Sequence, residues 1–155
     1  MAVVLVGRVG LSPVMVGRAD PLDRLAGLLE ATEIGGGDLP IVALVSGEAG
    51  IGKTRLLREF AAAAPADVRV LTAQAQPGSI GRPFHAVAPL TPEADPATGA
   101  HEAVREAAAA GRAVLLVEDL HWADADSVAV LDAITQSPWP HLMVLGTAST
   151  GRWPR

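Results

Sequence analysis

The sequence predicts one α/β domain in which helices cover a parallel β-sheet. Short aliphatic runs alternate along the chain with segments of helical periodicity, an alternation typical of parallel sheets with helical crossovers. Half of the 155 residues are hydrophobic, but aromatic residues make up only 3%. The core must therefore be built from Val, Leu, Ile and Ala, as the buried strands of parallel sheets usually are. The length suits one domain with a substantial core.

The composition excludes several classes of protein. A net charge of −5 argues against a broad DNA- or RNA-binding surface, which needs clustered Lys and Arg. The chain has no cysteine, which excludes disulfides, cysteine–zinc sites and thiol nucleophiles. The first sixteen residues are apolar, but they lack the basic start of a signal peptide and Arg8 interrupts them. We expect a cytoplasmic protein.

The first helix is expected directly after residues 15–18. Asp20 can cap it and Pro21 fits its first position. Four leucines form one apolar face of this helix, namely Leu22, Leu25, Leu28 and Leu29. The helix should end before the three glycines at 35–37, which read as a linker.

The middle of the chain predicts a strand, a glycine-rich turn, a helix and a second strand. The strands are expected at 41–45 and 68–73, and the helix at 53–64, ended by Pro65. Pro and Gly are dense from 74 to 99, where only 84–90 suggests a short helix.

The last third repeats the alternation. A helix is expected at 100–110, a third strand at 114–117 and a fourth strand at 142–145. Between these two strands lie an acidic loop, 118–126, and a helix at 127–135. Its inward face is expected to carry Val128, Val130, Leu131 and Ile134.

A phosphate-binding motif joins the first strand to the following helix. Residues 47–54 match G-x-x-x-x-G-K-[ST] in full, as Gly47, Glu48, Ala49, Gly50, Ile51, Gly52, Lys53 and Thr54. Backbone N–H groups of such a loop cradle phosphates at a helix N-terminus, and its three glycines are expected to adopt positive φ. Lys53 would reach the β- and γ-phosphates, and the Thr54 hydroxyl would ligate magnesium. A strand before the motif and a helix after it argue against a chance match, so we predict binding of a purine nucleoside triphosphate with Mg²⁺.

Two acids at the end of the third strand support this prediction. Beside a phosphate-binding loop, Glu118 and Asp119 would lie near the metal and the γ-phosphate. Glu118 would hold the metal through water and Asp119 would orient the attacking water, although the two tasks remain open to exchange. We expect structural roles for His121 and Trp122, and a helix cap from Asp124 or Asp126.

The motifs at 15–18, 47–54 and 115–124 together resemble one group of proteins. They are similar to the ATPase domain of the large LuxR-type transcriptional regulators, which belong to the STAND and AAA-like P-loop ATPases. The resemblance runs from about Val16 to Ala148. It implies a three-layer P-loop NTPase fold that acts as an ATP/ADP switch, with Val16, Gly17 and Arg18 at the adenine end of the nucleotide. It also implies a preference for ATP, since no Asn-Lys-x-Asp run for guanine is present.

The sequence departs from this group in three ways. Glu118 stands where Asp is commoner, and Thr147-Ala148-Ser149-Thr150 stands where relatives carry a basic residue that senses the γ-phosphate. The fifth strand and the helical lid have no counterpart, so the edge of the P-loop strand should be exposed. We therefore expect a fragment, a truncated product or a protein completed by a partner. The domain division is an extension at 1–14, the ATPase domain at 15–150 and a tail at 151–155.

Two functions fit these features best. The first is an ATP-binding, weakly hydrolysing switch domain, and the second is a non-catalytic module that binds nucleotide or a partner protein. A metabolite kinase fits less well, because no Arg-rich lid segment follows the fourth strand. Direct binding of nucleic acid fits poorly as well, since the chain is acidic and lacks a helix-turn-helix pattern.

Overall fold

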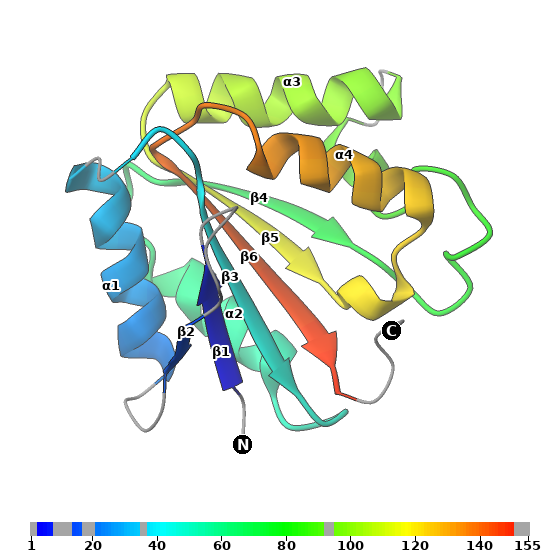
Figure 1. The fold of residues 1–155 in the computed structure, drawn as a ribbon, viewed down its shortest axis with the longest axis horizontal. Coiled ribbons are helices and arrows are strands. Elements are labelled where there is room, and N and C mark those ends of the chain that lie inside the picture. Colours follow the sequence, from blue (N-terminus) through cyan, green and yellow to red (C-terminus); the bar gives the residue numbers. More distant parts are fainter. Residues whose placement is uncertain (1–2, 8–13, 17–20, 35–36, 92–94, 151–155) are drawn as a thin grey trace.

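The structure is a six-stranded sheet with helices on both faces (Figure 1). This computed structural model describes residues 3–7, 14–16, 21–34, 37–91 and 95–150. The strands are β1 (Val3–Gly7), β2 (Val14–Val16), β3 (Ile41–Gly47), β4 (Arg69–Gln74), β5 (Ala113–Glu118) and β6 (Leu142–Ser149). The α-helices are α1 (Pro21–Ile34), α2 (Lys53–Ala63), α3 (Pro96–Ala109) and α4 (Ala125–Thr135).

Four strands form the predicted parallel sheet, in the order β3-β6-β5-β4. Their carboxyl ends meet at one edge, at the lower right in Figure 1. In an open parallel sheet that edge is where ligands bind. The α/β fold class is thus confirmed.

The core has two layers, one on each face of the sheet. On one face, α3 and α4 pack against β4, β5 and β6 through residues such as Val104, Leu115 and Ile134. On the other, α1 and α2 pack against β3, β5 and β6 through residues such as Leu25, Leu57 and Leu145. Every residue of β5 and β6 is buried, which suits the aliphatic runs at 113–117 and 142–145.

The edge of β3 is covered, contrary to the expectation drawn from the missing fifth strand. β1 runs antiparallel along it, from Val3 opposite Ser46 to Gly7 opposite Val42, and β2 pairs with the outer side of β1. The valine-rich run of β1 suits a strand, and the pairing satisfies backbone groups that would otherwise form an open edge. The segment assigned to an N-terminal extension therefore contributes a strand to the sheet.

Two helices differ from the sequence prediction. α3 begins at Pro96, four residues early, because Asp95 caps it by accepting a hydrogen bond from the Thr98 N–H. In α4, Val128 is 47% exposed and does not face inward, whereas Leu131 and Ile134 are buried as expected. α1, α2 and the other parallel strands lie within two residues of their expected ranges, whereas β6 continues beyond residue 145 to Ser149. The short helix suggested at 84–90 is a 3-10 helix at Ala88–Leu90, and β1 and β2 were not predicted.

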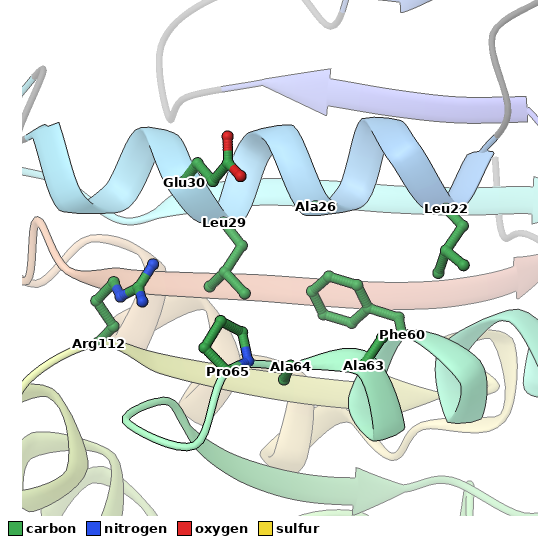
Figure 2. Close-up of a pocket in the computed structure, with 9 residues that line it drawn as sticks. All are labelled: Leu22, Ala26, Leu29, Glu30, Phe60, Ala63, Ala64, Pro65 and Arg112. Atoms are coloured by element: carbon green, nitrogen blue, oxygen red, sulfur yellow. The ribbon is translucent and has the colours of Figure 1, made fainter.

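A hollow of about 170 Å³ lies between α1 and the end of α2. Figure 2 shows Leu29 and Phe60 on its walls and Arg112 at one end. Arg112 donates a hydrogen bond of 2.9 Å to Asp67, which fixes the arginine at the rim. This hollow lies on a helical face, away from the carboxyl edge of the sheet.

Candidate nucleotide-binding site

The phosphate-binding motif occupies the turn between β3 and α2, at the carboxyl edge of the sheet (Figure 1). Gly50 and Gly52 have φ of +80° and +98°, a left-handed conformation that favours glycine. Gly47 does not have positive φ and is the buried last residue of β3, so that part of the prediction is wrong. The turn leads directly into the N-terminus of α2, where free N–H groups and the helix dipole attract anions.

Lys53, the first residue of α2, is held close against the loop. Its side chain is only 6% exposed, and its Nζ donates to the carbonyl oxygens of Gly47, at 3.0 Å, and Glu48, at 2.7 Å. The charge therefore lies inside the loop instead of projecting into solvent. Of the other motif residues, Ala49, Gly50, Gly52 and Thr54 line the pocket with Lys53, whereas Ile51 is 37% exposed and is not among the lining residues.

Glu118, the last residue of β5, lies beside the P-loop helix. Its side chain is 9% exposed, and burial raises the pKa of its carboxyl above the ordinary value. The positive charge of Arg58 and a hydrogen bond from Thr54 act in the opposite direction. The hydrogen bond shows that the two predicted magnesium ligands, far apart in sequence, are neighbours in space.

Asp119 begins the turn after β5 in an unusual backbone conformation. Its φ is +57°, which costs free energy in a residue other than glycine. Its N–H donates to Thr147 Oγ on β6, at 2.9 Å. The next residue, Leu120, lies over Gly146, where an added Cβ would come 2.5 Å from the Leu120 side chain. A hydrogen bond and a close packing contact thus fix Asp119 against β6.

His121, Trp122 and Ser149 complete the pocket, which has a volume of about 370 Å³. All three line it together with Asp119 and the P-loop, and His121 Nδ1 accepts a hydrogen bond from the Ser149 N–H at 3.2 Å. The sequence alone predicts only structural roles for the histidine and the tryptophan. Their position, directly after a strand that ends in two acids, was the signal in the sequence that they lie at the site.

Asp124 joins the acidic loop to the segment before α3. Its side chain is 1% exposed and caps α4 by accepting from the Ser127 N–H at 2.8 Å, as predicted. It also accepts from the Ser127 hydroxyl at 2.7 Å, the Phe84 N–H at 2.9 Å and the Ala86 N–H at 3.4 Å. Burial alone would raise the pKa of Asp124, but these hydrogen bonds outweigh it and hold the pKa below the ordinary value.

The donor set fits a magnesium nucleotide. Among the described residues no group of three or more His, Cys, Asp or Glu could hold a metal alone. Mg²⁺ commonly takes one or two protein oxygens and completes its shell with phosphate oxygens and water, and the Thr54–Glu118 pair matches that pattern. At the expected adenine end, Val16 is the last residue of β2, and Gly17 and Arg18 lie outside the described residues.

Comparisons with known proteins agree with this geometry. Residues 14–96 match the family described as AAA ATPase domain. No curated protein matches. The fold is similar to a chain in the structure of Drosophila ORC bound to AT-rich DNA and Cdc6, with a TM-score of 0.50 and 15% identity over 83% of this chain and 49% of that one. This chain therefore spans about half the length of its structural neighbour.

Proposed function

The chain belongs to the AAA ATPase domain family, and we propose that it binds ATP with Mg²⁺, hydrolyses it weakly and acts as a nucleotide-dependent switch. The observation that carries this proposal is the convergence of three segments on one pocket. The P-loop at the start of α2, the turn after β5 with Asp119, and the carboxyl end of β6 line this pocket, and Glu118 lies beside Thr54.

Each group in the pocket has a role in this proposal. The P-loop N–H groups and Lys53 bind the phosphates, and Thr54 with Glu118 holds the magnesium ion, which would neutralise phosphate charge. Asp119 orients the attacking water, and its fixed backbone supports that role because it limits the positions its carboxylate can take. The two acids remain candidates for each other's task.

The finer assignment is to a switch domain of a LuxR-type regulator or a related STAND ATPase. The run Leu115–Asp124 and the motif at 15–18 support it. In such a switch the ATP and ADP states differ in how the domain contacts a protein neighbour, and we propose a protein partner or further domains in that role. The net charge of −5 supports a chain that does not itself bind nucleic acid, and sequence-specific retardation of DNA at low salt would contradict this.

The first test is calorimetric titration of Mg²⁺–ATP into the wild-type chain and into Lys53→Ala. We expect binding by the wild type and a loss of at least about tenfold in affinity in the variant, because the lysine supplies the charge within the loop. Arg55→Ala is the matched control, since Arg55 is an exposed cation on the same helix that pairs with Glu59. Equal affinity in the wild type and Lys53→Ala would contradict the proposal.

A second candidate is a non-catalytic module that binds nucleotide without turnover. It is favoured by the end of β6, where residues 147–150 include no basic side chain. Phosphate release distinguishes the two candidates. Slow release that disappears in Glu118→Gln or Asp119→Asn supports the switch that hydrolyses ATP, whereas tight binding with no release in the wild type supports the non-catalytic module.

Localisation in the cytoplasm is also a proposal. Within the described part of the chain no helix has the length and apolar character needed to cross a membrane.

A further inference from the structure

The turn after β5 brings His121 to the phosphate-binding pocket. It lies in a short 3-10 helix, Leu120–Trp122, that is closed by a hydrogen bond of 2.8 Å from the Trp122 N–H to the Asp119 carbonyl. The turn is attached to β6 through the Asp119 N–H and Thr147 Oγ. The imidazole therefore extends from a backbone that is fixed at two points.

The hydrogen bond from Ser149 determines which imidazole nitrogen can donate. Nδ1 accepts from the Ser149 N–H at 3.2 Å, so it must present a lone pair and carry no hydrogen. The hydrogen of the ring then lies on Nε2, which makes Nε2–H a hydrogen-bond donor. A donor on the wall of a pocket formed by a P-loop is suited to a phosphate oxygen.

The position of His121 favours the terminal phosphate. In a P-loop the backbone N–H groups of the loop surround the β-phosphate, and the γ-phosphate lies beyond it, toward the acids that follow the neighbouring strand. His121 lines the pocket together with Asp119, two residues before it, and is hydrogen-bonded to Ser149 at the end of β6. Of the described residues that line the pocket, Lys53 is the only permanent cation. The negative charge that the γ-phosphate adds to ATP, compared with ADP, therefore has few side chains to contact.

We propose that His121 donates a hydrogen bond from Nε2 to a γ-phosphate oxygen, and that it is thereby a specificity-determining residue that makes the chain favour ATP over ADP. The inference rests on the proposed nucleotide site. It makes His121 the side chain that contacts the γ-phosphate, because residues 147–150 at the end of β6 include no basic side chain. ADP has no γ-phosphate and would not form this bond.

The test compares the affinities of a non-hydrolysable ATP analogue and of ADP, each with Mg²⁺, by calorimetry. For His121→Ala we expect the affinity for the ATP analogue to fall about tenfold and that for ADP to change less than about twofold. His121→Gln can place an amide N–H near the Nε2–H position and should keep most of the preference. His141→Ala, at the amino end of β6 and away from the pocket, is the matched control and should leave both affinities unchanged.

The outcomes separate this inference from the proposed function. Equal weakening of both ligands in His121→Ala, or no weakening of either, would overturn the role of His121 while nucleotide binding stands. A Gln variant as unselective as the Ala variant would also reject donation by Nε2. If the wild type binds neither ligand, the proposed function fails first. Retained ADP binding by His121→Ala shows that the variant is folded.

Discussion

Asp124→Asn tests how strongly one buried carboxylate holds two segments of the fold together. The wild-type side chain accepts hydrogen bonds from the Phe84 N–H and the Ser127 N–H at Oδ1, and from the Ala86 N–H and the Ser127 hydroxyl at Oδ2. In the asparagine, the amide oxygen can replace Oδ1, but the amide NH₂ takes the place of Oδ2. The Ser127 hydroxyl can rotate to accept from it, whereas the Ala86 N–H faces a second donor and keeps only its other acceptor, Ser127 Oγ at 3.2 Å.

The expected loss of stability follows from that difference. Hydrogen bonds to a charged acceptor contribute about 1.5–3 kcal/mol each, against about 0.5–1.5 kcal/mol for those to a neutral one, and the new amide NH₂ also sets a donor against the Ala86 N–H. We therefore expect Asp124→Asn to lower the free energy of unfolding by about 1.5–3 kcal/mol. Asp124→Ala, which removes every acceptor and the helix cap, should lower it by about 3–5 kcal/mol.

Urea denaturation at pH 7 measures this loss. With an m value of about 2 kcal/mol/M, a loss of 2 kcal/mol moves the midpoint down by about 1 M. Asp126→Asn is the matched control, because Asp126 lies exposed in the first turn of the same helix and should change stability by less than about 0.5 kcal/mol. If the two Asn variants unfold at the same urea concentration, the reasoning from the hydrogen bonds of Asp124 is refuted.

Two further predictions concern the strands beside the P-loop. Burial raises the pKa of Glu118, so the stability contributed by its protonated form is present at low pH and lost as the pH rises through the folded-state pKa. The Glu118→Gln side chain cannot ionise. In EDTA, the stability of this variant relative to the wild type should therefore increase progressively between about pH 4 and 8. A difference in urea midpoint that stays constant with pH would contradict this. Gly146→Ala should destabilise the chain by about 1–2 kcal/mol, because the new Cβ would meet the side chain of Leu120. Its control, Gly27→Ala in α1, meets nothing within 4 Å and should stabilise by about 0.5–1 kcal/mol, so thermal unfolding should move in opposite directions for the two variants.

The parallel sheet and its helices were predictable because their signals are local. The P-loop lies between an aliphatic strand and a helix, and both appear at nearly the predicted residues. The position of β1 was not predictable in this way. Its apolar run resembles part of a signal sequence as much as a strand, and only pairing with β3, more than thirty residues later, distinguishes the two.

In the candidate site, too, some residues could be predicted from the sequence and others could not. Lys53, Thr54 and Glu118 could be found because motif and strand place them at one edge of a parallel sheet. The sequence places His121 close to the two acids, but its role could not be assigned, because the backbone N–H that holds its ring belongs to a strand that comes 28 residues later. The exposed Val128 was misplaced because helical periodicity gives the faces of a helix and leaves open how much of each face the sheet covers.

The carboxyl end of β6 connects all three parts of the site. Thr150 N–H donates to the Gly47 carbonyl at the start of the P-loop, Thr147 Oγ accepts from the Asp119 N–H, and the Ser149 N–H donates to His121. These contacts join three of the four residues at 147–150 to the phosphate loop, the acid and the histidine. If this segment moved, the phosphate loop, the acid and the histidine would each have to move with it or lose a hydrogen bond to it. In a domain proposed to switch between ATP and ADP states, we therefore expect a structural change at the nucleotide to reach the rest of the sheet through the end of β6.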